Sequence, residues 1–127
     1  MAKQILIIDD DADWREEIAE VLLASDYDIL TAASKKEAYI TIDKINWSLA
    51  VDLVILDLSL SAIGIDSGLE VLRYLRNRQP TIPCIVITGF ELSMDRAHSL
   101  FRDYQVFAGL QKPHDLARLA DYVKQAL

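Results

Sequence analysis

The run Asp52-Leu53-Val54-Ile55-Leu56-Asp57 decides the fold class of this 127-residue chain. Its four central residues are apolar without alternation, which is typical of a strand covered on both faces. Other short apolar runs lie before and after it, and together they predict strands over Gln4–Asp9, Asp28–Thr31, Leu53–Asp57, Cys84–Thr88 and Val106–Leu110. Segments of helical period separate these runs. The sequence therefore predicts repeated βα units and a five-stranded parallel sheet with Leu53–Asp57 near its centre.

The segments between the strands carry helix signals. Ser34 and Glu37 fit a capping box, in which a hydroxyl and a carboxylate bond main-chain N–H groups at the start of a helix. Apolar residues at helical spacing supply the inner stripe of each segment. We expect helices over Ala12–Ala24, Ser34–Ile45, Gly68–Arg78, Leu92–Arg102 and Asp115–Ala126. Trp14 and Trp47 flank two of these helices and are interpreted as packing residues.

Length and composition predict one domain over residues 1–127. The chain is 52% apolar and 26% charged, which is enough for one compact core and too little for two. No linker or output module is expected. The single cysteine, Cys84, lies in an apolar run and is interpreted as a buried small hydrophobe.

The charge and hydropathy of the chain exclude two classes of partner. A net charge of −7 repels nucleic acid and anionic lipid, so we expect neither as a direct partner. No apolar stretch has the length of a membrane span or of a signal peptide. We expect a cytoplasmic protein whose partners are other proteins.

Five polar residues follow or end the predicted strands: Asp9, Asp10, Asp57, Thr88 and Lys112. Side chains just beyond the carboxyl ends of neighbouring parallel strands meet in one crevice, so these residues are predicted to form one site. The site would be acidic, with one hydroxyl and one ammonium group.

The neighbouring carboxylates of Asp9 and Asp10 have two interpretations. Asp11 and Asp13 follow them, and acidic residues at this point are favourable to the positive end of a helix. Capping accounts for one or two of these residues but poorly for all of them. Hard oxygen ligands gathered at a sheet edge suit Mg²⁺ or Mn²⁺, which is the interpretation we favour.

Asp57 ends the most apolar strand at the mouth of the sheet, where structural acids are rare. A carboxylate in this position can act as a nucleophile toward phosphorus if a metal and cationic groups neutralise the incoming oxygens. The hydroxyl of Thr88 has the chemistry to bond a phosphoryl oxygen, and Lys112 supplies the positive charge.

The chain resembles the receiver domains of two-component response regulators over essentially its whole length. The matching motifs are Ile5–Asp11, Asp52–Leu58, Gly68–Leu72, Ile87–Gly89 and Lys112–Pro113. The resemblance implies a flavodoxin-like doubly wound α/β fold with strand order 2-1-3-4-5. It also implies a phosphoacceptor that is not an enzyme beyond slow self-dephosphorylation.

The same resemblance implies roles for the site residues. Asp57 would accept a phosphoryl group from a histidine kinase or phosphotransfer protein. Asp10, Asp57 and the main-chain carbonyl of Ser59 would bind Mg²⁺ directly, with Asp9 acting through water, while Thr88 and Lys112 would hold the phosphoryl group. A downstream protein target would bind the face formed by the fourth helix, fifth strand and fifth helix.

The segment after the acceptor departs from the family pattern. The loop Ser59–Gly68 is longer than usual and lacks the proline that normally follows the acceptor. Ile63 and Ile65 are apolar residues on this loop. The segment is either a simple insertion or a lip that contacts a partner.

A second departure affects signalling. Family members carry an aromatic residue three positions before the lysine, and Gly109 stands there in this chain. We hypothesise that Phe107 partly substitutes for this ring, or that the output face works without it. Phe90, two residues beyond Thr88, is expected to obstruct water and slow dephosphorylation.

Three other functions are compatible with parts of the sequence. Gly109 and the long loop leave open a receiver-like adaptor that binds its partner without phosphorylation. A haloacid-dehalogenase-type phosphohydrolase also uses an aspartate nucleophile, but its second acid would stand where Ser59 is, and a flavin binder would need a less acidic first loop. The sequence does not identify the kinase, the target, the stimulus or whether the protein forms a homodimer. It also leaves open whether this chain is part of a larger protein.

Overall fold

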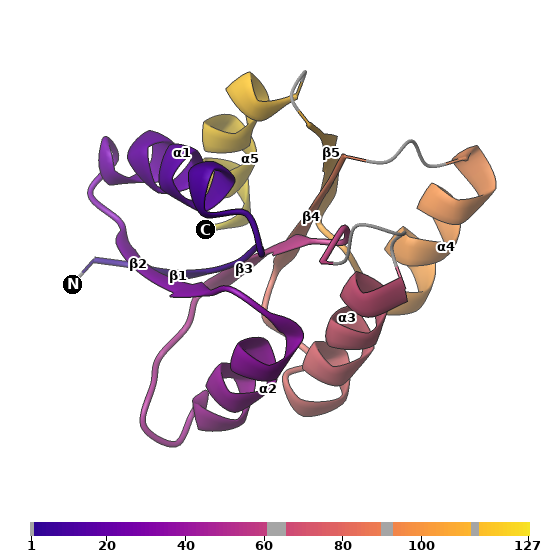
Figure 1. Ribbon diagram of the computed structural model, residues 1–127, viewed down its shortest axis with the longest axis horizontal. Coiled ribbons are helices and arrows are strands. Elements are labelled where there is room, and N and C mark those ends of the chain that lie inside the picture. The colour runs from indigo at the N-terminus through magenta and orange to yellow at the C-terminus, as the bar shows by residue number, and fades with distance from the viewer. Residues whose placement is uncertain (1, 61–65, 90–92, 113–114) are drawn as a thin grey trace.

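A computed structural model describes residues 2–60, 66–89, 93–112 and 115–127. In this part of the chain a five-stranded parallel sheet lies between two layers of helices (Figure 1). The strand order is β2-β1-β3-β4-β5, as the sequence predicts. The strands are β1 (Gln4–Ile8), β2 (Asp28–Ala32), β3 (Leu53–Asp57), β4 (Cys84–Thr88) and β5 (Ala108–Gln111).

Helices follow the strands in alternation, which confirms the doubly wound α/β fold. Two of them, α1 and α5, cover one face of the sheet, and the other three cover the opposite face (Figure 1). The helices are α1 (Ala12–Leu23), α2 (Lys35–Lys44), α3 (Asp66–Arg78), α4 (Met94–Tyr104) and α5 (Leu119–Ala126), with a 3₁₀ turn over Leu116–Arg118 before α5. No helix among the described residues is both long and apolar enough to cross a membrane.

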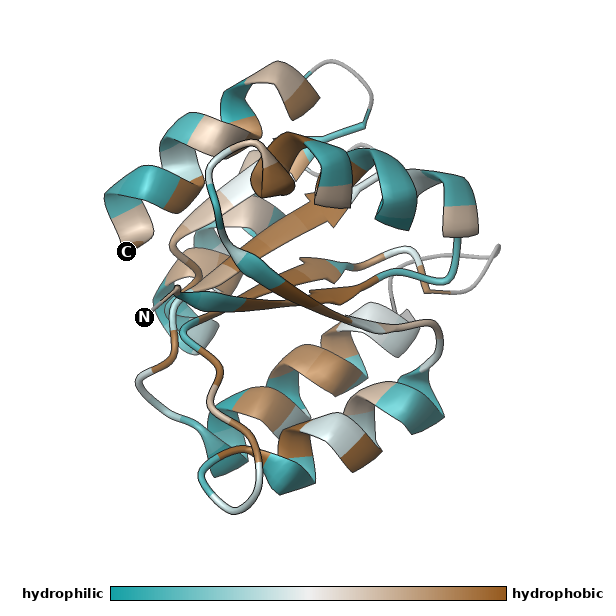
Figure 2. Ribbon diagram, turned by 90° about the vertical axis from the view of Figure 1, so that its left-hand side faces the viewer, coloured by the Kyte–Doolittle hydropathy of each residue, from teal (hydrophilic) through white to brown (hydrophobic). Residues whose placement is uncertain are grey.

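Alternation along the strands divides the core into two clusters. On β1, Ile5 and Ile7 pack toward α1 and α5, whereas Leu6 and Ile8 pack toward the opposite helices. All of β3 is buried, because helices cover both of its faces. Figure 2 shows the same arrangement, with mostly hydrophobic strands between helices that mix hydrophilic and hydrophobic residues.

The capping box at the start of α2 forms with one change. The Glu37 N–H donates to Ser34 Oγ at 3.1 Å, as expected. The Glu37 carboxylate accepts from the N–H of Ala33 at 3.0 Å, one residue earlier than the usual partner. Both bonds satisfy N–H groups near the helix start, where no earlier turn of the helix can accept from them.

The last strand begins two residues later than predicted. Gln105 adopts a left-handed conformation with φ of 52°, and this residue ends α4. Val106 is buried in the cluster below α2, α3 and α4, so β5 begins only at Ala108. The predicted start of α4 at Leu92 lies outside the described residues, and Ser93 caps the helix by accepting from the Arg96 N–H at 3.2 Å.

Arg76 on α3 fixes the carboxyl-terminal end of α4. Its Nε donates to the carbonyl of Tyr104 at 2.6 Å, and its Nη2 donates to the carbonyl of Gln105 at 3.2 Å. Its Nη1 donates to the carbonyls of Ile82 and Gln79 at 2.6 and 3.1 Å. One guanidinium group therefore joins three segments of main chain.

Candidate functional site at the carboxyl-terminal edge of the sheet

The fold brings the five predicted site residues to one edge of the sheet. Asp9 and Asp10 follow β1, Asp57 ends β3, Thr88 ends β4 and Lys112 directly follows β5. Two main-chain bonds fix the ends of these segments: the Asp9 N–H donates to the Ala32 carbonyl at 3.1 Å, and the Lys112 N–H donates to the Thr88 carbonyl at 2.9 Å. The backbone positions of the site are thus set by continued pairing between strands.

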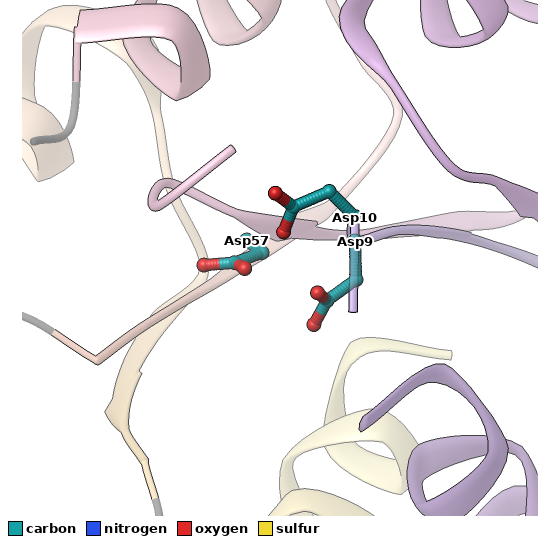
Figure 3. A group of neighbouring side chains, drawn as sticks. All are labelled: Asp9, Asp10 and Asp57. Carbon is teal, nitrogen blue, oxygen red and sulfur yellow. The ribbon is translucent and has the colours of Figure 1, made fainter. Parts of the chain in front are cut away.

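Asp9, Asp10 and Asp57 form an acidic cluster (Figure 3). One carboxylate oxygen from each residue lies within 4.8 Å of the other two. Mg²⁺ binds oxygens at about 2.0–2.1 Å in octahedral geometry, so its ligand oxygens are about 3 to 4 Å apart. The donor type and spacing therefore fit a small divalent cation after slight closing of the side chains.

Burial makes this cluster costly without a cation. The Asp9 and Asp57 side chains are buried, and burial raises the pKa of Asp9 despite its hydrogen bonds from Lys112 and the Asp11 N–H. The pKa of Asp10 is raised by burial and then by the charge of Asp9. A bound cation would favour the charged forms of both carboxyl groups and so relieve this cost.

Lys112 lies against two members of the cluster. Its Nζ donates to Asp9 Oδ2 at 2.8 Å and to Asp57 Oδ2 at 3.2 Å, and its side chain is only 9% exposed. An ammonium group in this position touches the proposed acceptor directly. It partly neutralises two buried carboxylates that would otherwise repel each other.

Ser59 joins the ends of β3 and β4. Its N–H donates to Asp57 Oδ1 at 2.8 Å, so each oxygen of the Asp57 carboxylate has a separate donor. Its hydroxyl is 2.9 Å from Thr88 Oγ1 and accepts from the Gly89 N–H at 3.2 Å. The resemblance to receiver domains implies a metal-binding carbonyl at Ser59 and makes this position, like Phe90, one that tunes the lifetime of the phosphoryl group. The bond between the Ser59 hydroxyl and Thr88 was not predicted, because it depends on how the segment after β3 lies beside β4.

The first turn of α1 also contributes to the site. Asp11 caps the helix by accepting from the N–H groups of Asp13 and Trp14 at 2.9 and 3.3 Å, so capping accounts for this acid. Arg15 Nη1 donates to the Asp9 carbonyl at 2.8 Å. This role of Arg15 was not predicted, because no motif indicates that its side chain turns back toward β1.

Gly109 lies beside a cavity between α4 and β5. This cavity has a volume of about 210 Å³ and is lined by Val86, Thr88, Ala97, Phe101, Gly109, Leu110, Gln111 and Asp115. A Cβ atom on Gly109 would be 3.5 Å from Phe101 Cζ. Phe107 precedes β5, is 43% exposed and is absent from the lining. Phe101 is therefore the aromatic residue whose ring lies next to Gly109. The hypothesis that Phe107 partly substitutes for the missing ring, or that the output face works without it, stays a prediction.

Three residues of interest cannot be placed. Ile63 and Ile65 of the long loop, and Phe90 after Thr88, lie outside the described residues. The expectations for a partner-contacting lip and for the lifetime of the phosphoryl group remain predictions.

A parallel sheet of order 2-1-3-4-5 with acidic groups and a lysine at its carboxyl-terminal edge defines the class of CheY-like receiver folds. The chain belongs to the response regulator receiver domain family, whose pattern it matches over residues 5–124. This family acts in two-component signalling.

The curated relatives are longer proteins. The chain is 32% identical to the transcriptional regulatory protein YrkP of Bacillus subtilis over 79% of its own length and 39% of that protein. It is also 32% identical to the response regulator PilR of Pseudomonas aeruginosa, over 98% of its own length and 26% of that protein. The chain thus spans between about a quarter and two fifths of these relatives.

Solved receiver structures share the fold. A signal receiver domain from Clostridium thermocellum superposes with a TM-score of 0.85 at 24% identity, covering all of this chain and 98% of the other. NtrX from Brucella abortus gives a TM-score of 0.81 at 28% identity, covering all of this chain and 27% of NtrX.

Proposed function

We propose that this domain accepts a phosphoryl group on Asp57 from a histidine kinase or phosphotransfer protein and then changes its contacts with a downstream protein. The observation that carries the proposal is the Asp57 carboxylate, which ends a central strand and lies 3.2 Å from Lys112 Nζ within the acidic cluster. Membership of the receiver family supports it.

In the proposed transfer, a carboxylate oxygen of Asp57 attacks the phosphorus of a phosphohistidine. A P–O bond forms and the P–N bond breaks, with its electron pair passing to the imidazole nitrogen, which takes a proton. Lys112 would neutralise charge on the phosphoryl oxygens from its position beside Asp57. Thr88 would exchange its hydrogen bond with Ser59 for one with the phosphoryl group.

A divalent cation fits the acidic cluster on donor type and spacing. Asp9, Asp10, Asp57 and the main-chain carbonyl of Ser59 would hold Mg²⁺ or Mn²⁺, which when bound supplies positive charge to the phosphoryl oxygens. Asp10, Asp57 and the Ser59 carbonyl would bind the cation directly, and Asp9 would act through water.

The proposal is tested with a small phosphodonor. The purified protein is incubated with Mg²⁺ and phosphoramidate or acetyl phosphate, and its intact mass is measured at once. We expect the gain of one phosphoryl group, which disappears in chelator and in Asp57→Ala but persists in Asp121→Ala, a matched change at an exposed aspartate on α5. Equal gain in Asp57→Ala and the parent would overturn the assignment of the acceptor.

A phosphorylation-independent adaptor is the second candidate, and the cavity beside Gly109 favours it. Without a large ring at position 109, the α4–β5 surface differs from the family pattern where the signal would leave the domain. Partner binding that survives in Asp57→Ala would support the adaptor. Binding that requires the phosphoryl group would exclude it.

A further inference from the structure

Trp14 lies in the first turn of α1 and faces Lys112. The centre of its ring is 4.9 Å from Lys112 Nζ, within the distance of about 6 Å over which the face of an indole attracts an ammonium group. Trp14 is half-buried and the Lys112 side chain is 9% exposed, so water screens this contact less than it would on an open surface.

The backbone that carries Trp14 is held by two hydrogen bonds. The main-chain N–H of Trp14 donates to the capping carboxylate of Asp11 at 3.3 Å, which holds the first turn of the helix. The next residue, Arg15, donates to the Asp9 carbonyl at 2.8 Å and ties the same turn to the end of β1. The helical turn that carries the indole is therefore tied to the strand end that carries the acidic cluster.

The other partners of Lys112 change during the proposed transfer. Asp9 and Asp57 hold its ammonium at 2.8 and 3.2 Å, but both belong to the cluster that fits a divalent cation. A divalent cation would bind the same carboxylate oxygens as Lys112 does. Phosphorylation would then remove the negative charge of the Asp57 carboxylate itself. The indole face has no charge to lose and offers the same attraction before and after transfer.

We propose that Trp14 is a positioning residue that keeps the Lys112 ammonium beside Asp57 while the carboxylates exchange partners. The inference rests on the proposed phosphoacceptor function. A packing role alone would be served by any apolar side chain of suitable size, whereas positioning requires an aromatic face.

The first test compares Trp14→Leu with Trp14→Phe and Trp14→Tyr. We expect the initial rate of phosphorylation by phosphoramidate with Mg²⁺ to fall roughly three- to tenfold in the leucine variant, and the aromatic variants to recover at least half of the lost rate. Trp47→Leu is the matched control, because Trp47 is 88% exposed and follows α2 at the opposite edge of the sheet. A leucine variant as fast as the parent would overturn the proposal.

A double-mutant cycle separates positioning from stability. If Trp14 acts through Lys112, Trp14→Leu causes no further loss of rate in a Lys112→Met background, measured over long incubation. An equal loss in both backgrounds would show that Trp14 acts through general stability and would overturn the proposal.

Fluorescence gives a test that needs no change at Trp14. The chain has two tryptophans, so Trp47→Phe leaves Trp14 as the single reporter. We expect Lys112→Met to shift the emission of Trp14, because the ammonium group no longer lies over the ring. An emission that is the same with and without Lys112 would contradict the contact, even if Trp14→Leu failed to fold.

The failure of this inference is distinct from the failure of the proposed function. A parent protein that gains no phosphoryl group would refute phosphoacceptor function. A parent that is phosphorylated, with Trp14→Leu equally fast, would refute only the role of Trp14.

Discussion

The acidic cluster and the surface around the cavity between α4 and β5, here called the α4–β5 surface, lie near neighbouring strand ends. Their side chains are packed very differently. At the cluster, Lys112 bonds two buried carboxylates, and the Ser59 N–H holds the remaining oxygen of Asp57. At the α4–β5 surface, Gly109 borders a cavity of about 210 Å³, and Phe101 above it is 41% exposed.

This difference leads us to expect that the proposed output surface can be changed with little effect on the proposed phosphoryl transfer. The groups proposed for phosphoryl transfer are held by charged hydrogen bonds, which are strong and directional. The surface proposed for output is loosely filled, so its side chains can be changed at small energetic cost. Thr88 belongs to both regions, since it bonds Ser59 and lines the cavity.

Loss of the Lys112 ammonium group should lower the phosphorylation rate more than any other change considered below. The loss should come from the acidic cluster alone. We expect Lys112→Met to slow phosphorylation by phosphoramidate at least about 10²-fold, because removing one group that stabilises transition-state charge commonly costs this much. Intact mass against time measures the rate. The control is Lys124→Met on the exposed side of α5, which should match the parent. A loss below tenfold would show that the cluster depends little on Lys112.

Substitution of one glycine in each region compares how tightly the two regions are packed. A Cβ atom on Gly68 would lie 2.3 Å from the main chain of Leu58, next to the acceptor, whereas on Gly109 the nearest contact would be 3.5 Å. We expect Gly68→Ala to lower the free energy of unfolding by about 3 kcal/mol, and Gly109→Ala to change it by less than about 1 kcal/mol. Urea unfolding measures both. Equal losses would contradict the contrast in packing.

Added Mg²⁺ should stabilise the fold more at neutral than at acid pH. The raised pKa values of Asp9 and Asp10 mean that the folded state binds protons more tightly than the unfolded state. Their contribution to stability is therefore full below the ordinary carboxyl value of 3.8 and is lost as pH rises through the folded-state values. Mg²⁺ binds the deprotonated carboxylates and should offset that loss.

Thermal unfolding with and without Mg²⁺ at several pH values measures this effect. At tenfold the dissociation constant, the stabilisation should reach about 1.4 kcal/mol near neutral pH and shrink toward pH 4. Asp10→Asn should reduce it, and Asp13→Asn, at an exposed position on α1, should leave it unchanged. A stabilisation by Mg²⁺ that does not depend on pH would argue against binding of the cation at Asp9 and Asp10.

Filling the cavity beside Gly109 should have the smallest effect on the rate of phosphorylation. Gly109→Phe places a ring beside Phe101 and Val86, where ordinary contact distances leave room for its first atom. We expect the phosphorylation rate to stay within about twofold of the parent, since the substitution does not touch the acidic cluster. NMR signals of Phe101 should shift. A large change in rate would show that the two regions are not separable.

Much of the fold follows from sequence because its signals are local and repeated. The apolar run Leu53–Asp57 and its neighbours predict buried strands, and the strand order follows from resemblance to receiver domains. The bounds of β5 were wrong because they depend on the left-handed conformation of Gln105, which no local preference of glutamine predicts.

The site was predictable where a residue directly follows a strand. Asp9, Asp57 and Lys112 come together because parallel pairing fixes their positions. Trp14 and Arg15 were not recognised, since their contacts depend on how the first turn of α1 sits against β1. Periodicity reports which side of a helix is buried, but it does not report which side chain reaches across to another strand.

Arg76 fixes one end of α4 and leaves the other end without this anchor. Two of its four bonds hold the carbonyls of Tyr104 and Gln105, so we expect a displacement of α4 to take the form of a tilt about that end. Eleven residues rising about 1.5 Å each give an arm of about 16 Å, and a tilt of about 10° moves the far end by about 3 Å. Met94, which is 73% exposed, lies at that far end. A small rotation about the Tyr104 end of α4 would therefore move the exposed Met94 end by about 3 Å.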